Sequence, residues 1–145
     1  MIGVPVQTTL NARCEQRLGR IVHASGVFDL HRIVSPAGDL WLRKPRRLVL
    51  ALTDSDLWLL EFRHWAIGFT IGGALSRFSR RDLVAHWRHR SWAWPAVWKA
   101  ELSWPDAATY VEGAMIGGAD ADRIVGLLAS DELSRQLDSS APALG

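Results

Sequence analysis

RRLVLALTDSDLWLLEF, residues 46–62, consists of two short apolar runs separated by the four residues 53–56, Thr-Asp-Ser-Asp. Aspartate and serine favour turns because their short side chains satisfy nearby backbone groups. In the second run Trp58, Leu60 and Phe62 occupy alternate positions, so they share one face of an extended chain. The stretch therefore predicts a β-hairpin, the clearest one in the sequence.

Short apolar runs separated by turn residues continue on both sides of this hairpin. They occupy residues 21–34, 40–43, 76–90, 97–104 and 108–116. Their lengths, their alternation and their β-branched and aromatic content favour strands over helices. A second hairpin is predicted at the Pro-Asp turn that follows residue 104.

The pattern changes after the glycine pair at residues 117–118. The next segment begins with acidic residues suited to a helix N-terminus, and it places Ile124, Leu127 and Leu128 at helical spacing. Residues 130–131, Ser-Asp, either interrupt this helix or cap a second one. The sequence thus predicts a mainly β fold of the α+β class, a small barrel or pair of sheets of six or seven antiparallel strands closed by a C-terminal helix.

The length of 145 residues fits one domain with a core of its own. Residues 1–20 are expected to form an N-terminal extension with a short helix that ends near Gly19. The domain itself is expected to span 21–138, and 139–145 to form a flexible tail.

Charge is unevenly distributed along the chain although the net charge is only +2. Residues 1–99 carry 15 Lys and Arg against 7 Asp and Glu, whereas residues 100–145 carry 2 against 8. Such polarity can orient a protein on an anionic surface or drive pairing between acidic and basic faces. The first residues lack signal-peptide character, and the longest uncharged run, 65–76, is too short to span a bilayer, so a cytoplasmic protein with at most peripheral membrane contact is expected.

Tryptophan is concentrated in residues 86–106, which hold five of the eight tryptophans. Alternation places four tryptophans on faces shared with other apolar residues, where they are expected to fill the core: Trp58, Trp87, Trp98 and Trp104. The connecting segment and the strand before it supply the residues expected to contact a partner: Trp92, Trp94, Arg88 and Arg90. The alternative is a loop folded back over the barrel mouth.

A basic run, RKPRR, precedes the first hairpin. Its four cations are Arg43, Lys44, Arg46 and Arg47, and Pro45 between them predicts a loop that leads into a strand. Arginine forks hold phosphate oxygens well, so the run is a candidate site for anionic lipid, with nucleic acid as a less favoured partner. A simple solvated turn is the alternative.

The sequence contains none of the common motifs that would indicate catalysis or cofactor binding. The one cysteine, Cys14, can form no disulfide within the chain and no multi-thiolate metal site. His86 and His89 are three apart and point to opposite faces of a strand, so they are poorly placed to share a metal. The glycine pairs match no nucleotide-binding fingerprint, and no nucleophile elbow is present. We therefore expect no enzymatic activity, no cofactor and no metal site.

Several of these elements occur in an order that resembles bacterial PH-like or GRAM-like domains. The matching elements are Leu52-Thr53-Asp54, the Arg81-Asp82-Leu83-Val84 strand start, the Pro105-Asp106 turn and the helix at Ile124 to Leu128. The resemblance covers about residues 46–129. It departs at Ala107-Ala108, where the family has glycine, so a wider turn is expected there.

The resemblance implies a binding module, because such domains hold lipids, peptides or partner proteins and rarely catalyse reactions. The first hypothesis is therefore a protein-interaction adaptor, or a subunit of a larger assembly, that acts through Trp92 and Trp94. The alternative is peripheral binding to an anionic membrane through the basic run. Both are expectations by analogy, since a fold does not determine a function.

Overall fold

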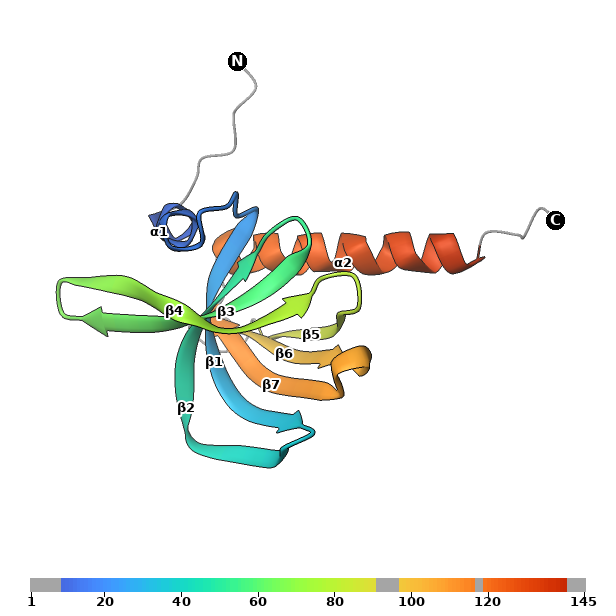
Figure 1. Cartoon of the computed structure of the whole chain (residues 1–145), viewed down its shortest axis with the longest axis horizontal. Helices are drawn as coiled ribbons and strands as arrows, with labels where there is room; N and C mark the ends of the chain where they lie inside the picture. The colour runs from blue at the N-terminus through green and yellow to red at the C-terminus, as the bar shows by residue number, and fades with distance from the viewer. Residues whose placement is uncertain (1–8, 91–96, 117–118, 141–145) are drawn as a thin grey trace, which may run out of the picture.

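A computed structural model describes residues 9–90, 97–116 and 119–140 (Figure 1). The described residues form seven strands, two α-helices and a short 3₁₀ helix. In chain order these are α1 (Thr9–Leu18), β1 (Ala24–Ser35), β2 (Gly38–Leu52), β3 (Asp56–Trp65), β4 (Gly68–Ser79), β5 (Val84–Arg90), β6 (Val97–Trp104), η1 (Pro105–Ala107), β7 (Thr109–Ile116) and α2 (Ala119–Ser140).

The seven strands belong to one antiparallel sheet with the order β4-β3-β2-β1-β7-β6-β5. Strands β1 to β4 pair in chain order, and so do β5 to β7. The pairing of β1 with β7 joins these two halves of the sheet. The prediction of a mainly β fold with a C-terminal helix is confirmed. The helix runs unbroken through residues 130–131, so they neither interrupt it nor cap a second one.

The sheet does not close into the predicted barrel. β4 and β5 are its two edges, and among the described residues they form no ladder with each other. Instead α2 covers the core, because its residues Ala121, Ile124 and Leu128 are buried in the same cluster as the strand residues. Because α2 supplies apolar side chains to the core, the core is covered although the two edge strands do not pair.

The C-terminal end of β2, residues 48–52, is buried on both faces of the sheet. One face meets the main core under α2, and the other is covered by α1 through a second cluster that contains Leu10, Cys14 and Val49. Burial raises the pKa of the Cys14 thiol to about 12, since a thiolate is poorly solvated there. A strand covered on both sides explains why the sequence is apolar at five consecutive positions.

The tryptophans expected in the core divide between the two clusters. Trp104 is 1% exposed and stacks on Phe78 with ring centroids 4.1 Å apart. Trp87 and Trp98 pack at the edge of the same cluster, whereas Trp58 packs on the opposite face beneath α1. The expectation is confirmed for Trp104. Trp58 shares its face with Leu60 and Phe62 as predicted, but that face packs in the second cluster under α1 and not in the main core.

The turn after β6 is closed without glycine. Ala108 adopts the left-handed conformation, with φ at 48°, and its N–H donates to the Pro105 carbonyl over 3.0 Å. Alanine at this position strains the backbone slightly, because its Cβ disfavours positive φ. The Ala107-Ala108 pair is therefore accommodated by a short 3₁₀ turn.

Candidate functional site

The basic run lies within strand β2 rather than in a loop. In the β1–β2 ladder Leu30 pairs with Arg46 and Arg32 pairs with Trp41, so residues 42–45 lie opposite His31 alone. This four-residue segment, which we call the β2 bulge, interrupts the ladder, and a proline can occupy it because no backbone N–H is needed there. The predicted loop was wrong, because the strand resumes on both sides of the proline.

Three of the four cations in this run have no carboxylate partner among the described residues. Arg43, Lys44 and Arg46 are exposed, and the part of the chain that the structure describes places no Asp or Glu oxygen within 4.0 Å of them. Arg47 differs because its Nε donates to Asp29 Oδ1 over 2.9 Å, an interaction that raises its pKa. The positive charge available to a ligand therefore comes from the first three residues.

Exposed apolar side chains precede the β2 bulge on the same strand. Leu40 is 55% exposed and Trp41 is 62% exposed. The Arg32 guanidinium lies 4.3 Å from the Trp41 ring centroid and donates to both Asp39 oxygens, at 2.9 and 2.8 Å. This pairing raises the pKa of Arg32 and lowers the pKa of Asp39. Trp41 is thus held in place while much of its ring faces solvent.

Sequence reasoning did not identify Leu40 and Trp41 as site residues. Their position in the sequence could have identified them, because they lie between the turn at residues 35–38 and the basic run. An apolar pair next to cations is unusual in a solvated hairpin. The structure places the apolar pair and all four predicted lipid-binding cations on one strand, β2.

The predicted partner site on the β5–β6 hairpin is described only in part. Arg88 is exposed and pairs directly across the strands with Lys99, and no carboxylate oxygen of a described residue lies within 4.0 Å of either. Two like charges in this arrangement repel each other. Trp92 and Trp94 lie outside the described residues, as does the side chain of Arg90.

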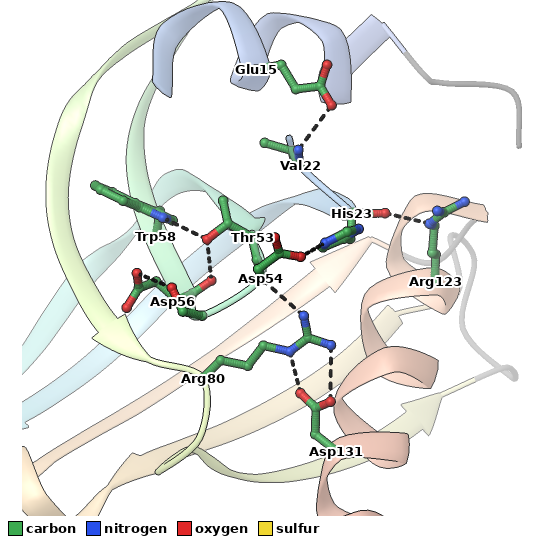
Figure 2. A network of polar contacts seen from close by, with 11 residues as sticks. Glu15, Val22, His23, Thr53, Asp54, Asp56, Trp58, Arg80, Arg123 and Asp131 are labelled. Atoms are coloured by element: carbon green, nitrogen blue, oxygen red, sulfur yellow. Dashed lines mark hydrogen bonds and ion pairs between the residues drawn. The ribbon is translucent and has the colours of Figure 1, made fainter. Parts of the chain in front are cut away.

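A network of polar contacts joins α2 to the β2–β3 turn (Figure 2). Arg80 donates to both carboxylate oxygens of Asp131, at 2.5 and 3.1 Å, and to the Thr53 carbonyl at 3.0 Å. His23 contacts Asp54, and its carbonyl accepts a hydrogen bond from Arg123 of α2. Charge-assisted pairs of this geometry hold elements together strongly.

The pocket beside this network has a volume of about 590 Å³. Both of its carboxylates, Asp54 and Asp131, already have cationic or histidine partners, and Arg80 uses all three of its nitrogens on protein atoms. The Arg135 guanidinium donates to the Arg81 carbonyl over 2.7 Å. These contacts hold α2 in position over the core. The sequence alone did not predict them, because Arg80 and Asp131 are far apart in the chain.

Further features limit what the described residues can do chemically. Within residues 9–90, 97–116 and 119–140, no three His, Cys, Asp or Glu side chains gather closely enough to hold a metal ion. Neither described helix combines the length and the apolar character needed to cross a bilayer. Comparison of the sequence with protein-family models and with curated proteins finds no match.

Proposed function

We propose that the chain is a non-enzymatic PH-like binding module that associates peripherally with anionic membranes. The PH-like assignment is supported by the chain order of seven antiparallel strands followed by a helix, the arrangement that the sequence resemblance implies. The membrane assignment is supported by one observation: Arg43, Lys44 and Arg46 are exposed without carboxylate partners in the described structure, on the strand that exposes Leu40 and Trp41.

An anionic bilayer fits this surface better than a nucleic acid does. Each basic residue near an anionic leaflet contributes about 1 kcal/mol, and tryptophan prefers the interface between headgroups and acyl chains. The Arg32 guanidinium lies over one face of the Trp41 ring. The aliphatic Leu40 beside it adds apolar area that a bilayer can bury and a phosphate backbone cannot.

Reversing two charges of the basic run should remove most membrane binding. We expect Lys44→Glu with Arg46→Glu to weaken binding to phosphatidylserine-containing vesicles by at least about 30-fold, which corresponds to about 2 kcal/mol for two lost cations. Wild-type binding should also weaken as salt is raised, because screening shortens the reach of exposed charges. Co-sedimentation with vesicles of graded phosphatidylserine content measures both effects.

The matched control is Arg88→Glu with Lys99→Glu, which makes the same change in net charge on another strand pair. The control should bind vesicles nearly as the wild type does. Equal losses in both variants, or equal binding to neutral and anionic vesicles, would show that the basic run is not the membrane site. A gel shift with duplex DNA that disappears only in the Lys44 and Arg46 variant would assign the run to nucleic acid instead.

A protein partner at the β5–β6 hairpin is a second candidate function. Its support is the direct pairing of Arg88 with Lys99 on the open edge of the sheet, an arrangement that an acidic partner segment would stabilise. In affinity purification from the native organism, a true partner should be recovered with wild type and with the Lys44 and Arg46 variant. The partner should be lost with the double variant Arg88→Glu and Lys99→Glu, and also with the double variant Trp92→Ala and Trp94→Ala. Recovery with all variants would exclude this site.

A further inference from the structure

The tip of the β3–β4 hairpin exposes two large apolar side chains. The ladder ends at the Trp65–Gly68 pair, so Ala66 and Ile67 alone form the turn. Ile67 is 92% exposed and Trp65 is 53% exposed. Figure 1 shows this hairpin projecting to the left, well beyond the rest of the sheet. The most protruding point of the hairpin is therefore apolar.

The local backbone gives no reason for isoleucine in this turn. Two-residue hairpin turns favour asparagine, aspartate and glycine, and Ile67 packs on almost nothing. Trp65 has a partial structural role, because its ring lies over Gly68, with Nε1 3.7 Å from the place that a Cβ would occupy. Even so, about half of Trp65 remains exposed. Ile67 thus has no role within the fold of the described chain.

Cations of α1 and β3 lie behind this tip, and Arg13 is the one that contacts β4 near it. Arg13 donates to the Phe69 carbonyl over 3.3 Å and its guanidinium lies 5.3 Å from the Phe69 ring centroid. Arg17 lies farther from the tip, because it lines a shallow hollow with residues 70–71 of β4 and its Nη2 is 3.6 Å from the place that a Cβ of Gly73 would occupy. Arg63 is also exposed, although it pairs with Glu61 over 2.9 Å. Neither Arg13 nor Arg17 has a carboxylate oxygen within 4.0 Å among the described residues.

The spacing between the apolar tip and Arg13 matches the structure of a membrane interface. Phe69, which Arg13 contacts, is two residues beyond Ile67, a distance of about 7 Å along an extended strand. Apolar groups of peripheral proteins enter the headgroup and acyl boundary by about 5–10 Å. Arg13, about 7 Å behind the tip, would therefore lie at the level of the lipid phosphates.

We propose that the β3–β4 hairpin tip inserts into anionic bilayers, with Ile67 and Trp65 among the upper acyl chains and Arg13 at the phosphates. The occupant is an anionic lipid surface rather than a protein, because a narrow apolar tip with a cation, Arg13, behind it is complementary to a bilayer whose charge lies above its apolar interior. This proposal shares its partner with the proposed function but rests on a different surface. The two can therefore succeed or fail separately.

A fluorophore at the tip tests insertion directly. The probe is an environment-sensitive dye attached to Ile67→Cys, with Leu133→Cys on α2 as the matched control, since Leu133 is also exposed, at 57%, but lies on another element. Cys14 is fully buried and its thiol pKa is raised, so labelling of the folded protein is directed to the introduced cysteine. With phosphatidylserine-containing vesicles, the dye at 67 should shift to the blue and be quenched by brominated lipids, whereas the dye at 133 should do neither.

A binding measurement complements the fluorescence. Ile67→Ser should weaken vesicle binding about tenfold or more, as expected when one isoleucine can no longer be buried. Leu133→Ser should leave binding unchanged. Bound protein with an unshifted dye at 67 would overturn insertion and leave the basic run of β2 as the membrane site. A dye at 67 that responds equally in the Lys44→Glu and Arg46→Glu variant would support insertion and overturn the proposed role of that run. No binding to any vesicle would overturn both.

Discussion

Gly113→Ala should destabilise the protein more than almost any other single-methyl change. Gly113 lies in β7 opposite Leu30 and Ala100, and an added Cβ would overlap the Phe28 ring and the Asp29 carbonyl oxygen. Phe28 is fully buried, and the carbonyl belongs to a paired strand, so neither can move away cheaply. Overpacking of this kind costs about 1–3 kcal/mol and sometimes more. We expect about 3 kcal/mol here because one obstacle is backbone.

The control adds the same methyl group where there is space. Gly126 lies within α2, and a Cβ there would meet nothing within 4 Å. Gly126→Ala should therefore stabilise the protein by about 1 kcal/mol through helix propensity. Chemical denaturation of both variants measures the difference, and a Gly113→Ala variant as stable as wild type would contradict the close β1–β7 packing.

Trp104→Ala should cause a comparable or larger loss of stability, about 3–5 kcal/mol. The Trp104 ring is almost fully buried, stacks on Phe78 and belongs to the main core. Its Nε1 has no hydrogen-bond partner among the described residues, so the ring is retained for its volume and not for its N–H. Trp104→Phe should consequently recover much of the stability that alanine loses.

A second tryptophan provides the comparison for this prediction. Trp41 is 62% exposed, and its main described contact is the Arg32 guanidinium. Trp41→Ala should cost less than about 1 kcal/mol, the range of an exposed cation–π contact. Urea denaturation curves of the two alanine variants should differ mainly in midpoint. Equal losses of stability in Trp104→Ala and Trp41→Ala would contradict the burial of the Trp104 ring and the exposure of the Trp41 ring.

The strands and the closing helix could be predicted because their signals are local. The turn at residues 53–56 is followed by β3 at Asp56, and Leu52 pairs with Leu57 across it, as the turn chemistry indicates. Alternation between Val97 and Trp104 also places Ala100, Leu102 and Trp104 in the core. Turn residues and periodicity act over a few positions, so they can be recognised in one sequence.

The face of β3 that meets the main core could not be predicted from alternation. Residues 57–60, Leu-Trp-Leu-Leu, are apolar at every position, and parity alone does not say which side is interior. Leu57 and Leu59 enter the main core, whereas Trp58 and Leu60 enter the cluster under α1. The decision depends on where α1 lies, which is a contact between distant segments.

The candidate sites were only partly predictable, because some of their features are local in the sequence and others depend on contacts between distant segments. The cations of the basic run are visible in the sequence, but the β2 bulge depends on the register opposite His31, which belongs to another strand. The exposure of Ile67 depends on how far the hairpin extends beyond its neighbours. The Arg80–Asp131 pair joins positions 51 residues apart, and no local pattern relates them.

The position of β1 between the two halves of the sheet has a consequence for synthesis of the chain. β1 pairs with β2 soon after both are made, but its other edge waits for β7, since Phe28 pairs with Met115. Contacts this distant in sequence form late and slow the folding reaction. During translation the nascent β1–β4 meander therefore presents an unpaired strand edge beside apolar side chains. That edge is the segment on which we expect chaperones to act and nascent chains to aggregate.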